Sequence, residues 1–139
     1  MLSIKKIVDT TIRQDNRIIL PAVAAGFPSP AADFEENSLN IGEYIVKNPE
    51  STFFVRASGD SMIQAGILPG SILVVDKSRR TKHNSIVIVC IDGDFTVKRL
   101  QRKGSEWLLK AENPAYKPMK LTVENHIIWG VVTFVITSV

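Results

Sequence analysis

The sequence contains 139 residues, of which 45% are hydrophobic and 22% are charged, and its formal net charge is +3. This length suits one domain of ordinary size, and the composition is that of a folded globular protein. The longest apolar run, Ile127 to Ile136, has ten residues, about half of the roughly 20 that a membrane-spanning helix needs. These values exclude a largely disordered chain and argue against a membrane span.

Residues 1–38 have no sustained helical or strand periodicity, and we expect them to form an extended N-terminal arm. Pro28 and Pro30 fix their own backbone φ angles and disfavour helix in the residues before them. Ala22 and Ala24 form an A-x-A pattern similar to a secretory cleavage site. Charged residues interrupt the preceding segment, however, so we expect no signal peptide.

A short helix is expected after the arm. Asn40 is a favourable N-cap with Glu43 three positions later, and Pro49 marks the point where the helix must have ended. Three apolar residues share one face at helical spacing: Ile41, Tyr44 and Ile45.

The rest of the chain predicts a β-rich core domain over residues 39–139. Its short runs of β-branched and aromatic residues, separated by turn residues, are TFFVRA, SILVVD, SIVIVCI, FTVKRL, EWLLK and IIWGVVTFVIT. Asp92-Gly93 is typical of a tight hairpin, so residues 85–91 should pair with residues 95–100. Near-continuous apolar strands indicate burial on more than one face. We therefore predict a mainly β fold: a folded-over sheet or partly open barrel of short strands, with one short helix and an extended arm.

Few residues that could hold a metal or form a disulfide are present. Cys90 is the single cysteine, and the two histidines, His83 and His126, lie far apart in the sequence. A structural zinc site needs about four such ligands. We predict no metal and no other cofactor.

The turn within ASGDSMIQAG holds a candidate reactive side chain. Ser61 follows Gly59 and Asp60 directly after a predicted strand, and glycine allows the backbone angles of a tight turn. Successive backbone N–H groups in such a turn can bind developing negative charge. Ser61 is thus either an ordinary turn residue or a nucleophile, and a nucleophile needs a base. No local pattern ties His83 or His126 to Ser61, although a triad assembled in space stays open.

Lys98 is the second candidate base. Alternation along FTVKRL places Lys98 on the same strand face as Thr96 and Leu100. A lysine in a strand commonly faces solvent. If this face is buried instead, desolvation lowers the lysine pKa from about 10.4, and a neutral amine beside Ser61 could accept the hydroxyl proton. The residues alone leave both orientations open.

Together these motifs resemble the LexA/UmuD family of self-cleaving serine peptidases, which use a Ser-Lys dyad. The resemblance rests on ASGDSM, on the lysine of DGDFTVKRL 37 positions after Ser61, and on AAGFPSPAADF in the arm, and it extends to GVV near the end of the core. It implies Ser61 as nucleophile, Lys98 as general base and the Ala25–Gly26 bond as the cleavage site. Ala25 stands where UmuD-like proteins can have cysteine.

Physical chemistry agrees with these implied roles. The small side chains around the Ala25–Gly26 bond allow its carbonyl to approach a turn closely. The backbone N–H groups of Asp60 and Ser61 would form the oxyanion site, an expectation that comes from the turn itself. Holding the substrate in the same chain also replaces a bimolecular encounter. Met62 is expected to pack and to take no part in chemistry.

The resemblance also implies a biological role. LexA-type repressors carry an N-terminal helix-turn-helix domain, and the 25 residues before the expected cleavage bond are too few for one. A UmuD-like protein is therefore implied: a cytoplasmic homodimer that acts as accessory subunit of an error-prone translesion DNA polymerase. Its partners would be the UmuC-like catalytic subunit and RecA filaments on single-stranded DNA, which stimulate cleavage in the SOS response to DNA damage.

Three alternatives stay open. A signal peptidase has similar serine and lysine motifs but would need a membrane anchor. In a non-enzymatic polymerase-binding module, Ser61 would be only a turn residue. A DNA-binding module would use the basic segment Lys77 to His83. This segment belongs to residues 77–110, which contain nine basic and three acidic residues. No aromatic residues interleave with that segment for base stacking, so we do not expect direct sequence-specific DNA binding.

Overall fold

The structure, a computed structural model, describes residues 3–5, 17–20 and 37–139. These residues belong to two compact units, which divide between Lys47 and Asn48. One unit contains β1 (Ser3–Lys5) and residues 48–139, and the other contains β2 (Arg17–Leu20), β3 (Asn37–Asn40) and α1 (Ile41–Ile45). The division into an arm of residues 1–38 and a core of residues 39–139 stays a prediction.

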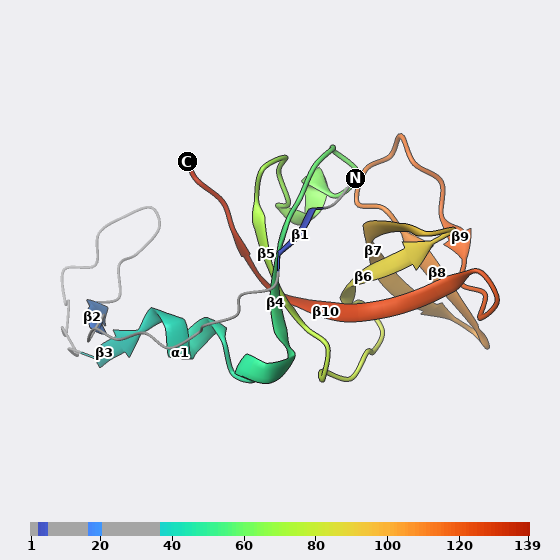
Figure 1. Ribbon diagram of the computed structural model, residues 1–139. Helices are drawn as coiled ribbons and strands as arrows, with labels where there is room; N and C mark the ends of the chain where they lie inside the picture. The colour runs from blue at the N-terminus through green and yellow to red at the C-terminus, as the bar shows by residue number, and fades with distance from the viewer. Residues whose placement is uncertain (1–2, 6–16, 21–36) are drawn as a thin grey trace. The chain divides into compact units, whose positions relative to one another are not determined.

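The larger unit is built on one antiparallel sheet (Figure 1). Its eight strands follow the order β1, β4 (Thr52–Arg56), β5 (Ile72–Asp76), β10 (His126–Ile136), β6 (Ile86–Ile91), β7 (Asp94–Lys103), β8 (Glu106–Lys110) and β9 (Met119–Lys120). Two short 3-10 helices, Pro49–Ser51 and Ile63–Ala65, flank β4. Every strand predicted in the core is present, and the mainly β fold with one short α-helix is confirmed.

Strand β10 joins the two halves of this sheet. Its residues 131–136 pair with β5, and its residues 126–131 pair with β6. The register shifts twice along β10, between Ile128 and Gly130 and between Val132 and Phe134. Such bulges bend a strand and increase its twist, so one long strand can serve both halves.

The hairpin between β6 and β7 confirms the prediction from Asp92-Gly93. Pairing runs from Ile91 opposite Asp94 to Ile86 opposite Arg99. Asp92 and Gly93 have φ angles of 49° and 84°, and two successive positive φ angles are what a type I′ hairpin turn requires.

The core lies on both faces of β6, as the apolar strands predicted. Val87, Ile88 and Val89 are all 0% exposed. Ile88 packs in a cluster that includes Val55, Met62, Leu73 and Val97. The neighbouring Val87 and Val89 pack in a second cluster with Leu100 and Leu109.

In the smaller unit, β2 pairs with β3 in antiparallel register, and α1 follows β3 directly. The Asn40 side chain accepts a hydrogen bond from the Glu43 backbone N–H at 3.2 Å, which confirms the predicted N-cap. The sequence does not predict strands β1, β2, β3 and β9. Each has two to four residues, too few for alternation to stand out in the sequence.

Candidate active site

Ser61 lies in the turn between β4 and the 3-10 helix Ile63–Ala65. Gly59 has a φ angle of 79°, in the region that favours glycine, as the expected tight turn required. Two backbone hydrogen bonds hold the start of the turn beside β5. The Ala57 N–H donates to the Ser71 carbonyl, and the Gly70 N–H donates to the Ala57 carbonyl, both at 2.8 Å. The candidate nucleophile is therefore attached to a fixed strand end.

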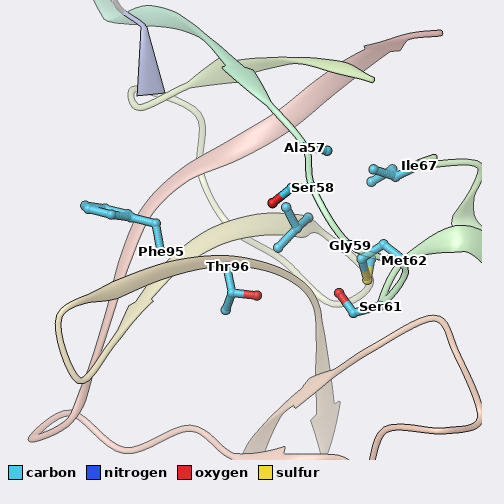
Figure 2. Close-up of a pocket in the computed structure, with 9 residues that line it drawn as sticks. Ala57, Ser58, Gly59, Ser61, Met62, Ile67, Phe95 and Thr96 are labelled. Carbon is cyan, nitrogen blue, oxygen red and sulfur yellow. The ribbon is translucent and has the colours of Figure 1, made fainter. Parts of the chain in front are cut away.

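Ser61 lines a pocket between this turn and β7 (Figure 2). One wall comes from the turn and the segment after it, and the other comes from Phe95, Thr96 and Val97 of β7. Figure 2 shows the Ser61 and Thr96 hydroxyl groups on opposite sides of the pocket. Met62 is 2% exposed and packs in the core, so its expected packing role is confirmed. The pocket offers a place where a peptide carbonyl could reach the Ser61 hydroxyl.

Lys98 is the next residue of β7 after the pocket-lining Val97. Its side chain is half-buried, and desolvation lowers its pKa from the ordinary value of 10.5. The Lys98 Nζ atom lies 5.3 Å from the centre of the Tyr116 ring. Of the two orientations left open by the sequence, the partly buried one is present. No hydrogen bond joins the Ser61 and Lys98 side chains, both of which the structure describes.

The loop of residues 112–118, which the sequence predicts only as a separator between strands, holds the Ser61 turn. The Tyr116 hydroxyl donates to Asp60 Oδ1 at 2.8 Å, and Asn113 Nδ2 donates to the Asp60 carbonyl at 2.9 Å. The Gln64 N–H donates to the Glu112 carbonyl at 2.9 Å. The hydrogen bond to the Asp60 carboxylate raises the pKa of Tyr116, because a phenolate would lose this bond and be repelled by the carboxylate charge.

This loop could have been noticed from one signal. Within ENPAYKP, an exposed aromatic residue, Tyr116, stands between two prolines. Asn113 and the two prolines are common turn residues, so their presence needs no functional explanation. Only the folded structure brings Tyr116 to Asp60.

The two histidines are engaged elsewhere. His83 Nδ1 accepts a hydrogen bond from the Arg102 N–H at 2.9 Å, and His126 Nδ1 accepts one from the Thr122 N–H at 2.9 Å. Neither histidine lines the Ser61 pocket. The geometry therefore gives the alternative of a Ser-His-Asp triad no support.

The basic segment lies in the loop between β5 and β6. Lys77, Arg79, Arg80 and Lys82 are exposed. Lys77 Nζ lies 5.0 Å from the centre of the Trp129 ring. Most of the segment is thus a solvated surface loop, the plainer of the interpretations that its charge allowed.

Other predictions fall outside the described residues. Ala25 and Gly26, the expected cleavage site, are among them, so their placement relative to Ser61 stays a prediction. Over the part of the chain that is described, no helix is both long and apolar enough to cross a membrane.

Comparison with known proteins decides the family. Residues 17–133 match the peptidase S24-like family. The chain belongs to this family. It is 47% identical to Protein ImpA of Salmonella typhimurium over 119 residues, which cover 81% of this chain and 77% of ImpA. It is 50% identical over 109 residues to Protein SamA of Salmonella typhimurium strain LT2, covering 78% of this chain and 76% of SamA.

A more distant relative connects the chain to the repressors. The LexA repressor of Vibrio campbellii is 36% identical over 122 residues, which cover 86% of this chain but only 59% of the repressor. These relatives confirm the prediction that the chain is a UmuD-like member of the LexA/UmuD group. The predicted enzyme class, a self-cleaving serine peptidase, is confirmed by the family.

Proposed function

We propose that this chain hydrolyses its own Ala25–Gly26 bond, with Ser61 as nucleophile and Lys98 as general base. The observation that carries the proposal is the position of Ser61 in a pocket whose opposite wall is β7, the strand that also bears Lys98. Partial burial of Lys98 supports the assignment, because it lowers the pKa of the amine and so increases the neutral fraction that can accept a proton.

The reaction would take place in two stages. In the first, the neutral Lys98 amine accepts the Ser61 hydroxyl proton while Ser61 Oγ attacks the Ala25 carbonyl carbon. The Asp60 and Ser61 backbone N–H groups would stabilise the resulting oxyanion. The Lys98 ammonium then protonates the Gly26 nitrogen as the peptide bond breaks, which leaves an ester between Ala25 and Ser61.

In the second stage, water hydrolyses this ester. Lys98 accepts a proton from the attacking water and returns one to Ser61 Oγ, so the Ser61 hydroxyl and the neutral Lys98 amine are regenerated. The products are a segment of residues 1–25 with a new carboxylate at Ala25 and a segment of residues 26–139 with a new amine at Gly26. No cofactor is required by this sequence of steps.

The pH dependence follows from the state of Lys98. Only the neutral amine accepts a proton, so the cleavage rate should rise with pH and level off above the Lys98 pKa. Because desolvation lowers this pKa, the rate should reach half of its maximum below pH 10.5.

The experiment is intact-mass spectrometry of the purified chain after incubation between pH 7 and 10.5. We expect loss of residues 1–25 in the parent and in Lys103→Ala, which removes an exposed lysine from the same strand. Ser61→Ala and Lys98→Ala should keep the full mass. Cleavage that persists in either of these two variants, or a rate that stays flat with pH, would refute the dyad. A parent of unchanged mass would favour the non-enzymatic binding module.

We also infer a role for the processed chain as a homodimeric, cytoplasmic accessory subunit of an error-prone DNA polymerase in SOS mutagenesis. The similarity to ImpA and SamA supports this role. Addition of RecA filaments on single-stranded DNA should then increase the cleavage rate of the parent. A polymerase catalytic subunit of the UmuC type should co-purify with residues 26–139 and not with an unrelated S24 domain. A monomer by light scattering would contradict the homodimer.

A further inference from the structure

The loop of residues 112–116 contacts the neighbours of both proposed catalytic residues. On the Ser61 side, Tyr116 and Asn113 bind Asp60, the residue before Ser61. On the Lys98 side, the Tyr116 ring faces the Lys98 Nζ atom at 5.3 Å. Tyr116 thus spans from the turn after β4 to β7.

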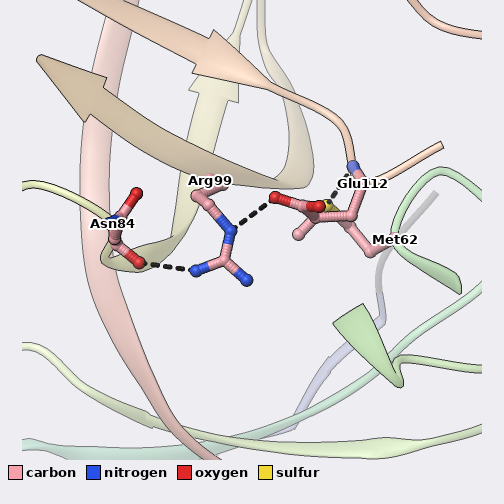
Figure 3. Close-up of polar contacts among 4 residues, drawn as sticks. All are labelled: Met62, Asn84, Arg99 and Glu112. Atoms are coloured by element: carbon pink, nitrogen blue, oxygen red, sulfur yellow. Dashed lines mark hydrogen bonds and ion pairs between the residues drawn. The ribbon is translucent and has the colours of Figure 1, made fainter. Parts of the chain in front are cut away.

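A second connection runs through Glu112 of the same loop to the residues that follow Ser61 and Lys98 in the sequence (Figure 3). Glu112 Oε1 forms an ion pair with Arg99 Nε, and Arg99 follows Lys98. The Glu112 N–H donates to the Met62 Sδ atom at 3.3 Å, and Met62 follows Ser61. Arg99 is also fixed by its bond to the Asn84 carbonyl at 2.8 Å. The loop therefore joins the turn and the strand at two points.

We propose that Tyr116 is a positioning residue of the peptidase, which holds the Ser61 turn and the Lys98 side chain in the relative placement that cleavage requires. This inference rests on the proposed function of Ser61 and Lys98. Tyr116 touches neither the Ser61 hydroxyl nor, in the proposed reaction, the scissile bond, so it acts through Asp60 and through Lys98.

The exposure of Tyr116 separates this role from an ordinary packing role. Tyr116 is 43% exposed and belongs to neither of the two buried hydrophobic clusters. Hydrogen bonds and cation contacts at exposed sites contribute little to the stability of a fold. Placement of reacting groups is more sensitive, because an error of about 1 Å can reduce a rate about a hundredfold. Loss of Tyr116 should therefore affect cleavage far more than folding.

Two substitutions separate the two contacts of Tyr116. Tyr116→Phe keeps the ring over Lys98 and removes the hydrogen bond to Asp60. Tyr116→Leu removes both. Both substitutions change the surroundings of two charged groups, Lys98 on β7 and Asp60 on the turn. Glu112, the acidic residue of the same loop, forms its ion pair with Arg99.

The chain offers a matched control. Tyr44 also has a lysine amine, Lys47 Nζ, 5.3 Å from the centre of its ring, and it belongs to the other compact unit. Tyr44→Phe therefore makes the same chemical change beside the same type of cation contact, in the unit that does not contain Ser61.

The experiment measures first-order cleavage rates between pH 7 and 10.5 for the parent, the three tyrosine variants and Ser61→Ala, together with urea unfolding of each. We expect Tyr116→Phe to lower the plateau rate about tenfold and Tyr116→Leu about a hundredfold. The pH at half-maximal rate should stay at the parent's value in Tyr116→Phe, because the ring still covers Lys98, and should shift in Tyr116→Leu, where the ring contact with the amine is lost. Urea midpoints should stay close to the parent's.

The outcomes distinguish this inference from the proposed function. If the parent cleaves, Ser61→Ala does not, and both Tyr116 variants cleave at the parent's rate, the positioning role is overturned while the dyad stands. Rates that fall only in proportion to lost stability, or that fall equally in Tyr44→Phe, would also overturn it. A parent that does not cleave at any pH would remove the proposed function, and this inference with it.

Discussion

Asp76, at the end of β5, is a carboxylate whose charge should stabilise the fold at neutral pH. It is 6% exposed. Asp76 Oδ1 accepts hydrogen bonds from Ser51 Oγ at 2.8 Å, Ser78 Oγ at 2.7 Å and the Ser78 N–H at 2.9 Å. Asp76 Oδ2 accepts one from Asn48 Nδ2 at 2.9 Å. The carboxylate thus joins the segment that enters β4 to the loop that leaves β5.

The magnitude follows from its pKa. Burial alone would raise the pKa of Asp76, but the hydrogen bonds from Asn48, Ser78 and Ser51 outweigh burial and lower it from 3.8 to about 2. At about 1.36 kcal/mol per pH unit, this difference corresponds to roughly 2.4 kcal/mol. Asn48 and Ser78 are open to solvent, and screening there reduces the value. We therefore expect Asp76→Asn to lower the free energy of unfolding by about 1 to 2 kcal/mol at pH 7.

The pH dependence tests the cause. A folded-state pKa below the unfolded value gives a stabilisation that is complete above pH 3.8 and is lost as pH falls toward 2. The difference in unfolding free energy between the parent and Asp76→Asn, measured by urea denaturation, should be constant from pH 7 to 5. It should fall to about half by pH 3. Glu124→Gln, at an exposed position, is the control and should give no such change. A parent-to-variant difference that does not shrink in acid would refute the assigned role of the charge.

Three further substitutions test the packing of the sheet. Gly130→Ala would place a Cβ atom 2.6 Å from Val75 Cγ1. Overpacking of this kind should lower the free energy of unfolding, measured in urea, by about 1 to 3 kcal/mol. An unchanged free energy of unfolding would show that β10 can shift. Ile88→Ala, at a side chain with 0% exposure, should lower stability by about 2 to 5 kcal/mol, and a loss below that range would contradict its place in the core. Gly93→Ala meets no close atom but forces a non-glycine residue to a φ angle of 84°, so we expect a loss of about 1 kcal/mol, whereas increased stability would contradict the observed turn.

Local sequence signals predicted the parts of the fold that depend on local chemistry. Asp92-Gly93 fixes its own hairpin, and Asn40 caps α1 through a residue three positions away, so both features could be read directly. Strand β1 exists through pairing with β4, about 50 residues later, and β9 has two residues. Neither pairing leaves a periodic pattern in the sequence.

The candidate site shows the same division. The turn that holds Ser61 follows from Gly59, and strand alternation identified the neighbours of Lys98. The burial of Lys98 could not be derived, because one of the groups that cover it, Tyr116, comes from a loop 18 positions further along the chain. Alternation assigns a residue to a face of a strand, but long-range packing decides whether that face meets water.

The position of β10 has a consequence for how the chain reaches this fold. Strands β5 and β6 are consecutive in the sequence, yet β10 lies between them in the sheet. During synthesis, the segments up to residue 120 can form their hairpins but cannot close the sheet, because the strand that joins its halves begins only at His126. Contacts over such sequence separations slow folding relative to local ones. The growing chain therefore exposes the inner edges of β5 and β6 until nearly all of the described core has left the ribosome, and strand edges of this kind are where association between unfinished chains begins.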